Sequence, residues 1–500
     1  MTKPGRQKIS AVDTAWLRMD RPGNLMMICA VLLFAKRVSL SRVARIIDER
    51  FIRFERFQQR PVQIRGAAFW ESAPHFSTAD HIERVTLPGE AGTAELQTLV
   101  SRLASTPLDP QRPLWQFHLV ESFAGGSALI ARIHHCYADG IALVRVLMSM
   151  TDAAANGPPA MPFEAPQRNA GEEVGDDPLA RSLAPLSGAL AAARRWGATL
   201  VEKGAAIWND PAKAVELAQQ GGALTAEIAT LALMPRDSPT RFKGKPDIEK
   251  RVAWADPLPL NEVKAIGKAL AASVNDVLLS CVAGALRGYI VEKGDATEGR
   301  LIRALVPVNL RPLEKAYRLG NQFGLVFLDL PIGIENPVER LYAVRANMTA
   351  LKGSYQPVLA LGLLAAMGAG PRALQEELLQ ALSRNASAVM TNVPGPSRPL
   401  YFAGAKIERF LFWVPQSGDI GMGVSILSYN GHVQFGLITD RALCPDPERV
   451  IELFGAEFER LVLTTLLAPW PREGDLDPAD AAMAVLGAAS KQAAPATLVS

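Results

Sequence analysis

The stretch Ile133-His134-His135-Cys136-Tyr137-Ala138-Asp139-Gly140 stands between two apolar segments of different pattern. Residues 128–135 are an apolar run typical of a strand, and residues 141–150 have the pattern of a helix. Asp139 precedes the helical run and is its predicted N-cap. The stretch therefore predicts a strand-to-helix junction, which is the basic step of an α/β fold.

The two histidines of this junction are expected to face opposite ways. Successive strand side chains point to opposite faces of a sheet, so Ile133 and His135 share one side and His134 lies on the other. Only one histidine can then enter a given cavity. Adjacent strand residues do not readily chelate one metal ion, and no HExxH motif supports a metal site. The same alternation separates Cys136 from His135, which counts against a cysteine nucleophile.

Proton transfer suits this junction better. An imidazole with a pKa near neutral can remove a proton from a weakly acidic hydroxyl, so His135 is a candidate general base. Asp139 could hold the local geometry by capping the helix or by pairing with an arginine. The alternative is that two satisfied histidines simply end a core strand, and the junction by itself leaves both interpretations open.

Around the junction, the chain predicts two α/β units. In residues 1–150, strand-like runs alternate with a helical pattern, the strands at 26–34, 115–120 and 128–135 and the helix at 41–57. A second unit at 243–470 has predicted strands at 250–254, 301–308, 324–330, 425–429 and 432–437 and a helix at 275–292. Its last two strands flank Asn430-Gly431, a two-residue hairpin turn in which both positions tolerate positive φ.

Two segments lie outside these units. Residues 151–242 are rich in Ala, Gly and Pro at first and then Ala-rich, which predicts a linker followed by a helical connector. The Ala-rich tail at 471–500 is predicted to be disordered.

Composition narrows the class of protein. The 500 residues, 49% of them hydrophobic, suffice for two domains with cores, and a net charge of +3 is too small for a dedicated nucleic-acid binder. The four cysteines form no CxxC pair, which argues against a disulfide framework or a zinc site and favours a reducing cytosol. Residues 25–35 have the length of a signal-peptide core, but Asp13 and Asp20 precede them and no small-residue cleavage site follows. We therefore expect a buried strand there.

Other segments connect the junction with a known family. His-His-x-x-x-Asp-Gly resembles the motif of the CoA-dependent acyltransferase superfamily, and over about residues 8–465 the chain is similar to the bacterial wax ester synthase/diacylglycerol acyltransferase family. The further matching segments are Pro113-Leu114-Trp115, Asn275-Asp276, Asn392-Val393-Pro394-Gly395-Pro396 and an opening stretch with Ser10, Asp13, Leu17 and Pro22. The chain departs from the pattern at Met27, where many members have a histidine.

The resemblance implies a fold and a reaction. The fold would be α/β, with two chloramphenicol-acetyltransferase-like domains of mixed sheets and a channel between them. The reaction would transfer a long-chain acyl group from acyl-CoA to a fatty alcohol or a diacylglycerol, giving wax ester or triacylglycerol. Acyl-CoA is then a substrate, and neither a cofactor nor a metal is implied. In the motif, His135 would be the general base beside His134 and Gly140, and Asp139 would form a salt bridge that fixes the loop.

The resemblance also implies supporting residues, namely Pro113, Leu114, Trp115, Asn275, Asp276, Asn392, Pro394 and Gly395. Each has a simpler explanation as well: Asn275 as a helix N-cap, Trp115 as a core residue and residues 392–396 as a rigid turn. The apolar helical run at 357–367 either lines a lipid channel or forms a core helix, and its prolines and glycines make it a weak membrane span.

Two other functions stay open at this point. One is a condensation enzyme that joins acyl groups on carrier proteins, although no carrier domain fits in the remaining residues. The other is a non-catalytic lipid-binding or lipid-droplet protein, against which the intact His135 and Asp139 argue.

We expect a cytoplasmic protein that associates peripherally with the inner face of the membrane or with lipid inclusions. Between Lys36 and Arg65, nine basic residues stand against three acidic ones. Such a run is a solvated face by default, but it also attracts anionic lipid head groups or CoA phosphates.

The protein should therefore bind anionic vesicles and be released as salt rises, because attraction between exposed charges is screened within about 8 Å at physiological ionic strength. Vesicle flotation at increasing NaCl checks this. Binding that persists in high salt would indicate apolar insertion instead, and resistance to carbonate extraction would contradict peripheral association.

Overall fold

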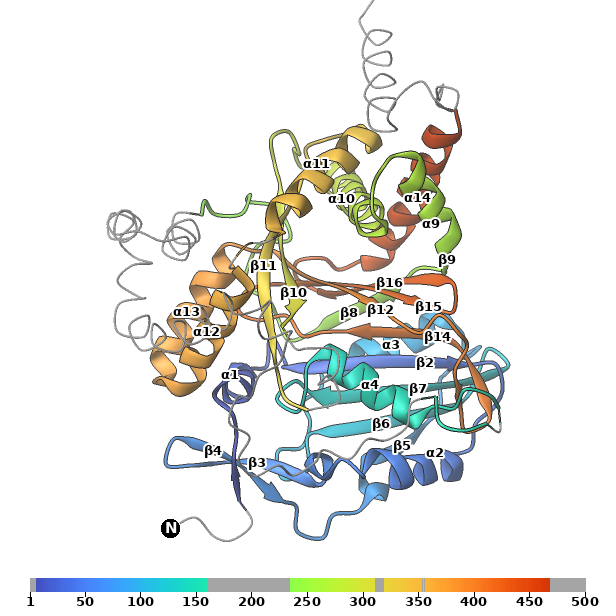
Figure 1. Cartoon of the computed structure of the whole chain (residues 1–500), viewed down its shortest axis with the longest axis vertical. Coiled ribbons are helices and arrows are strands. Elements are labelled where there is room, and N and C mark those ends of the chain that lie inside the picture. Colours follow the sequence, from blue (N-terminus) through green and yellow to red (C-terminus); the bar gives the residue numbers. More distant parts are fainter. Residues whose placement is uncertain are drawn as a thin grey trace, which may run out of the picture.

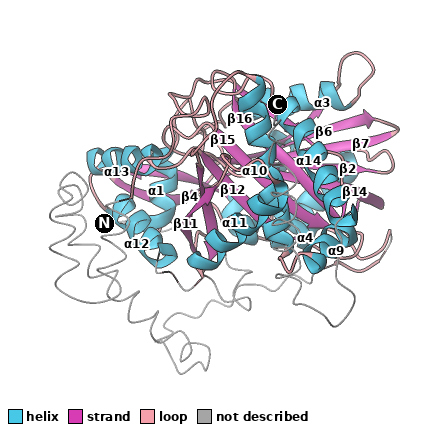
Figure 2. Ribbon diagram, turned by 90° about the horizontal axis from the view of Figure 1, so that it is seen from above, coloured by secondary structure: helices cyan, strands magenta, loops and turns pink. Residues whose placement is uncertain are grey.

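The computed structural model describes residues 6–155, 157–160, 234–310, 319–352, 354 and 356–467. Two large mixed sheets lie one above the other, with helices packed around them (Figures 1 and 2). The mixed α/β fold expected from the sequence is thus confirmed. Most of the predicted linker and helical connector at 151–242 and the predicted tail at 471–500 lie outside the described residues.

The lower sheet in Figure 1 contains β7, the strand that leads into the histidine motif. Its strands run in the order β13-β14-β2-β7-β6-β5, and all neighbours are antiparallel except β5 and β6. The bounds are β2 (Met27–Phe34), β5 (Ile82–Val85), β6 (Trp115–Phe123), β7 (Gly126–His134), β13 (Tyr401–Phe402) and β14 (Ala405–Trp413). The three strands predicted for residues 1–150 are confirmed, including the buried strand at 26–34.

β14 comes from the second predicted unit, yet it completes the first sheet. It pairs with β2 from Ile407 opposite Phe34 to Trp413 opposite Cys29. The hydroxyl of Tyr429, in the second sheet, donates to the carbonyl of Ile407 at 2.9 Å. The two units are therefore joined by a shared strand, although the unit boundaries predicted from the sequence stay a prediction.

The upper sheet has the order β11-β10-β12-β15-β16-β8, with β9 also paired to β16. Its strands are β8 (Lys250–Trp254), β9 (Leu258–Pro259), β10 (Ile302–Asn309), β11 (Phe323–Leu330), β12 (Ala388–Pro394), β15 (Met422–Tyr429) and β16 (His432–Asp440). Asn430 and Gly431 have φ values of +48° and +77°, which confirms the predicted hairpin turn.

This upper sheet forks between β10 and β12. The two strands pair only at Ala304 with Ala388 and at Leu305 with Val389. β10 nevertheless stays paired with β11 as far as its last residue, and β12 stays paired with β15. The β10–β11 hairpin consequently leaves the sheet and reaches the histidine motif, where Gly320 forms a bridge with Ala138.

Helices cover both sheets. The upper sheet carries α9 (Leu260–Ala269), α10 (Val274–Glu292), α11 (Pro337–Leu351) and α14 (Pro447–Leu467), and the lower sheet carries α3 (Thr93–Ala104) and α4 (Gly140–Met150) on opposite faces. α1 (Ala11–Met19), α12 (Gln356–Ala369) and α13 (Arg372–Arg384) lie together at one edge (Figure 1). A small sheet of β1 (Gln7–Lys8), β4 (Ala67–Ser72) and β3 (Gln59–Ile64) stands beside them.

The helix predicted at 41–57 is shorter and interrupted. α2 (Leu40–Ile46) continues as a wide helical turn (Ile47–Phe51), and a separate turn follows at Glu55–Gln58. Phe51 and Phe57 are both buried and stack with ring centroids 4.0 Å apart. A continuous helix would place residues six apart on different faces, so the chain must turn to bury both rings.

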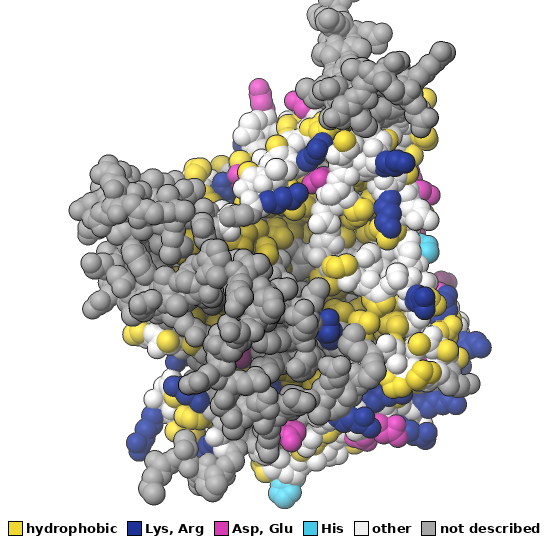
Figure 3. Space-filling model, viewed as in Figure 1, with side chains coloured by type: hydrophobic (Ala, Val, Ile, Leu, Met, Phe, Trp, Pro, Cys, Tyr) yellow, Lys and Arg dark blue, Asp and Glu magenta, His cyan; other side chains and the backbone are white. Residues whose placement is uncertain are grey.

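Two surface features bear on membranes. Of the nine basic residues between Lys36 and Arg65, six are exposed, and Figure 3 shows Lys and Arg side chains gathered at the lower right, near α2 in Figure 1. α10 is long and apolar enough to cross a membrane, but 72% of its apolar window is buried inside the protein. Its burial is that of a core helix.

The contact between α1 and α12 depends on a glycine. A Cβ added to Gly368 in α12 would lie 1.6 Å from the carbonyl oxygen of Ala11 in α1. We expect Gly368→Ala to force the helices apart and to lower the free energy of unfolding by about 1–3 kcal/mol. Urea denaturation measures this.

The matched control is Gly455→Ala in α14, where a Cβ would meet no atom within 4 Å. It should stabilise the protein by about 0.4–1 kcal/mol, because alanine reduces the entropy of the unfolded chain. If both variants unfolded at the same urea concentration, α1 and α12 would not be in close contact.

Candidate active site

The histidine motif starts at the end of β7 and is held by its backbone from both sides. The amide of His134 donates to the carbonyl of Leu114 at 2.9 Å, and the amide of His135 donates to the carbonyl of Met26 at 2.7 Å. Along β7, Ile133 and Ile130 belong to core clusters on opposite faces of the sheet. The alternation predicted from the sequence is thus present.

His135 lies in a closed aromatic environment. Its side chain is 3% exposed and stacks on Trp16 of α1, with ring centroids 4.1 Å apart and an interplanar angle of 18°. The ring centroid of Phe323 in β11 lies 5.7 Å from the ring centroid of His135. Burial lowers the pKa of His135 to about 4, and the charge of Asp139 opposes part of this shift. The imidazole is therefore neutral at physiological pH, which is the state that a general base requires.

The turn at His135 is also bound by the β10–β11 hairpin. The side-chain amide of Asn321 donates to the carbonyl of His135 at 2.7 Å and to a carboxylate oxygen of Asp13 at 2.7 Å. The backbone amide of Asn321 donates to the same carboxylate at 3.0 Å, and the hydroxyl of Ser10 donates at 2.7 Å. Burial raises the pKa of Asp13. One chain of hydrogen bonds thus links α1, the hairpin and the catalytic candidate.

Asp139 fixes the residues that follow. It is the N-cap of α4, as predicted, and accepts from the amide of Ala142 at 2.9 Å. Its second oxygen accepts from the amide of Gln322 at 3.1 Å. The predicted salt bridge of Asp139 stays a prediction. Gly140 is the first residue of α4 and lines an apolar cavity.

His134 faces away from His135, as the alternation requires. Its Nδ1 accepts from the amide of Cys136 at 3.1 Å, and its Nε2 lies 3.8 Å from a carboxylate oxygen of Asp20. Burial lowers the pKa of His134 to about 3, so this ring is neutral as well.

Residues 113–115 form a frame around the motif. Trp115 is 1% exposed, donates its indole N–H to the carbonyl of Phe57 at 2.7 Å, and stacks on His81 with centroids 4.1 Å apart. The amide of Leu114 donates to the hydroxyl oxygen of Tyr137 at 3.0 Å, and Pro113 precedes these contacts. These contacts make Trp115 a core residue that holds the motif.

Residues 275–276 and 392–395 meet each other. The side-chain amide of Asn392 in β12 donates to the side-chain oxygen of Asn275 at 2.6 Å. The N-cap of α10 is Ser273, which forms a capping box with Asp276, so the interpretation of Asn275 as the N-cap was wrong. Nothing in the described part of the chain shows a hydrogen bond from this pair to His135. Gly395 follows Pro394 and is needed for close approach, because a Cβ there would lie 2.4 Å from the carbonyl oxygen of Ser428.

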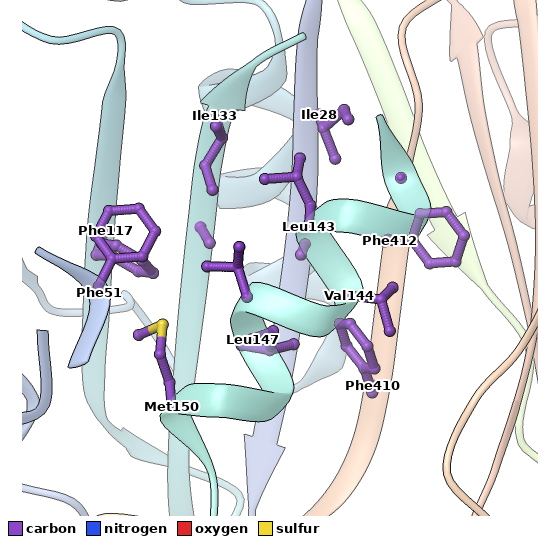
Figure 4. A pocket seen from close by; sticks show the side chains of 14 residues that line it. Ile28, Phe51, Phe117, Ile133, Leu143, Val144, Leu147, Met150, Phe410 and Phe412 are labelled. Atoms are coloured by element: carbon purple, nitrogen blue, oxygen red, sulfur yellow. The ribbon is translucent and has the colours of Figure 1, made fainter. Parts of the chain in front are cut away.

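An apolar cavity begins beside the motif and runs between α4 and the lower sheet (Figure 4). Ile133 and Gly140 lie at the motif, whereas Leu147 and Met150 lie further along α4. Phe410 and Phe412 reach into it from β14. No charged or hydrogen-bonding side chain lines it, and its free volume of ≈ 50 Å³ admits only a short part of an alkyl chain.

Sequence reasoning missed two residues of the site. Trp16 follows Asp13 by three residues, which is about one helical turn. This spacing puts both side chains on one face of a helix and could have indicated that Trp16 lies at the site together with Asp13. Asn321 precedes the predicted strand at 324–330 and carried no separate signal, because its partners lie 186 and 308 residues away in the chain.

Comparisons with known proteins agree with this geometry. The family model described as wax ester synthase/diacylglycerol acyltransferase catalytic domain matches residues 9–278, and the corresponding C-terminal domain model matches residues 319–462. A Mycobacterium tuberculosis protein named as a probable diacylglycerol O-acyltransferase is 28% identical over 397 residues, covering 78% of this chain and 80% of that protein.

Among solved structures, the wax ester synthase/diacylglycerol acyltransferase of Marinobacter aquaeolei is similar, with a TM-score of 0.65, 22% identity, and coverage of 92% of this chain and 100% of that one. The first condensation domain of the calcium-dependent antibiotic synthetase has a TM-score of 0.56 and 15% identity, with 93% and 97% covered. At these identities the two structures show a shared fold alone.

Removal of the Asn321 side chain tests the hydrogen-bond chain. Asn321→Ala removes one hydrogen-bond donor from the buried carboxylate of Asp13 and one from the carbonyl of His135. We therefore expect the free energy of unfolding to fall by about 1–3 kcal/mol and kcat to fall as well. The control is Asn347→Ala in α11, which removes a comparable bond to the carbonyl of Asp329. It should cost stability without lowering kcat. Equal kcat in both variants would remove Asn321 from the site.

Proposed function

The chain belongs to the wax ester synthase/diacylglycerol acyltransferase family, and on this premise we propose that it acylates a fatty alcohol or a diacylglycerol from long-chain acyl-CoA, with His135 as the general base. The protein is an acyltransferase by its family. The observation that carries the role of His135 is its state: a buried neutral imidazole, oriented by the stack on Trp16 and held at its backbone by Met26 and Asn321.

The proposed reaction needs one proton carrier. His135 takes the proton from the acceptor hydroxyl while the oxygen attacks the thioester carbonyl carbon. The tetrahedral intermediate then collapses, the carbon–sulfur bond breaks, and the proton returns to the departing thiolate of CoA. The products are the ester and free CoA. The lowered pKa of His135 makes the imidazolium a good acid for this second step.

The apolar cavity beside the motif supports a role in holding an alkyl chain. Its lining comes from α4, β2, β6, β7, β14 and the helical turn Ile47–Phe51, and it contains no polar side chain. A chain placed there would have its reactive end near Gly140 and Ile133, next to the histidine turn. We assign Asn275, Asp276, Asn392, Pro394 and Gly395 to support of the second sheet beside the fork.

The proposed substrates indicate where in the cell the protein acts. Diacylglycerol and long-chain alcohols reside in membranes or lipid inclusions, so the protein must reach such a surface. The exposed basic residues around α2 support a peripheral, charge-assisted contact with the inner face of the membrane. The condensation-domain similarity is one of fold and adds no second candidate function.

The test is an assay with purified protein and sixteen-carbon acyl-CoA, offered hexadecanol and a diacylglycerol side by side. Formation of either ester with release of CoA is the expected result. Absence of both esters, with substrate binding intact, would contradict the proposal.

Substitution of the two histidines separates their roles. His135→Ala should lower the rate at least about a hundredfold, the factor typical of a general base, while the protein stays folded. His134→Ala should lose less, because its ring faces the opposite side of β7. Initial rates and thermal melting are measured together. Small and equal losses at both positions, with normal melting, would end the assignment.

Acceptor selectivity should be broad. An apolar wall discriminates weakly, since one methylene is worth only about 1–3 kcal/mol. We expect alcohols of ten to eighteen carbons and diacylglycerol all to be accepted, which kcat/KM values across this series will show. A preference above about a thousandfold for one acceptor would require a hydrogen-bonded recognition site in place of an apolar one.

A further inference from the structure

A larger pocket lies at the end of the lower sheet opposite to the histidine motif. β2, β5 and β6 run in one direction and end at this pocket, whereas β7 runs against them and leads into the motif. β2 pairs with β7 from Met27, opposite His134, to Phe34, which spans roughly 23 Å at about 3.3 Å per residue. The pocket is therefore a site apart from the catalytic candidate.

The walls of this pocket come from the connection between β2 and α2, the residues after β5 and the end of β6. Its free volume is ≈ 550 Å³, which is within the range of about 300–1,000 Å³ for sites of small organic ligands. The amide of Val38 donates to the hydroxyl of Ser127 at 2.8 Å. The amide of Leu40 donates to the carboxylate of Glu121 at 3.2 Å. These two bonds hold the connection between β2 and α2 in place, so the pocket is preformed.

Two arginines line the pocket with donors to spare. Arg37 donates to the hydroxyl of Ser122 at 3.1 Å and forms no ion pair with a carboxylate of the described residues. The Nε of Arg84 lies 3.3 Å from Oε2 of Glu121, and no described residue accepts a hydrogen bond from the guanidinium of Arg84. Glu121 is the one carboxylate in the lining, so two positive charges and one negative charge leave a net charge of +1. A guanidinium offers five N–H donors in a planar fork, which matches the oxygens of a phosphate group.

The rest of the lining suits the part of a ligand that adjoins a phosphate. Ser39 and Thr86 add hydroxyl groups, which also donate to phosphate oxygens. Val38 and Leu87 are buried and give the pocket an apolar side. Free phosphate has no apolar part to place against these side chains. A glycerophospholipid has one, because its glycerol and the first carbons of its acyl chains follow the phosphate.

The position of the pocket distinguishes between lipids and CoA as the source of the phosphate. The thioester of acyl-CoA must meet His135, and the packed strands of the lower sheet lie between that residue and the pocket. The phosphates of a reacting acyl-CoA are therefore poorly placed to reach Arg37 and Arg84. A membrane lipid has no such restriction, because it approaches from outside the protein.

We propose that the pocket lined by Arg37 and Arg84 binds the phosphate group of an anionic glycerophospholipid and so determines which side of the protein meets the membrane. The inference rests on the proposed function, in which the substrates come from a lipid phase, and adds a head-group site to it. The exposed Lys36 and Arg45 stand near the pocket in the chain but do not line it. They contribute general attraction to anionic lipids, whereas the pocket holds one head group.

A pair of double variants separates the pocket from general attraction. Arg37→Gln with Arg84→Gln and the matched control Lys36→Gln with Arg45→Gln each remove two positive charges from the same region. Flotation with vesicles of phosphatidylcholine and phosphatidylglycerol gives the Kd of each full-length protein. We expect the pocket variant to bind at least about tenfold more weakly than the control, the factor of one charge-assisted hydrogen bond. Equal losses in the two variants, or no loss in either, would overturn the proposal. Thermal melting should be the same in both, because exposed ion pairs contribute little to stability.

Cysteine labelling identifies the ligand. All four native cysteines are buried, so Thr86→Cys provides one reactive thiol in the pocket, and Thr98→Cys on the exposed side of α3 is the control. Dioctanoyl phosphatidylglycerol should slow modification of the thiol at position 86 by a maleimide at least about fivefold, through charge-assisted bonds that uncharged dioctanoylglycerol cannot form. Inorganic phosphate and CoA should leave the rate unchanged. Equal protection by phosphate or by CoA, or no protection by the phospholipid, would refute a lipid site.

Neither measurement needs ester synthesis. An active enzyme whose vesicle binding does not depend on Arg37 and Arg84 refutes the head-group site alone. An inactive enzyme that binds vesicles through these arginines refutes the proposed function and leaves the site standing.

Discussion

The hydrogen bond from the Asn321 side chain to the carbonyl of His135 is the contact on which the site depends. Asn321 lies two residues before β11 of the second sheet, and His135 directly follows β7 of the first. The same amide binds Asp13 of α1, so three segments distant in sequence are fixed by one side chain. A change in the packing of either sheet would therefore shift the backbone carbonyl of His135.

The shared strand β14 explains why the two sheets cannot be treated as independent. It pairs with β2, carries Phe410 and Phe412 into the cavity under α4, and packs Trp413 against Trp254 of the second sheet. The wall of the apolar cavity thus combines residues from two distant parts of the chain. The fork between β10 and β12 also connects the two sheets. Where the pairing of these strands stops, the β10–β11 hairpin leaves the second sheet and contacts the histidine motif of the first.

Local patterns in the sequence were sufficient for much of this. Alternation along residues 128–135 placed the two histidines on opposite faces, the Asp139 position predicted the N-cap of α4, and Asn430-Gly431 predicted a hairpin turn, all of which the structure confirms. These features depend on contacts between residues a few positions apart, whose geometry is set by backbone periodicity. The resemblance of the motif also led to the correct family.

The arrangement of these elements was decided by tertiary structure. The stack of Trp16 on His135, the bonds of Asn321 and the meeting of Asn275 with Asn392 join residues separated by more than a hundred positions, and no local pattern encodes such pairs. The helix expected at 41–57 breaks because two phenylalanines must reach one core. The sequence by itself determined the motif, the family and several of the elements. The lowered pKa of His135 and the apolar cavity under α4 exist only once the sheets are packed, because burial and enclosure are properties of the folded chain.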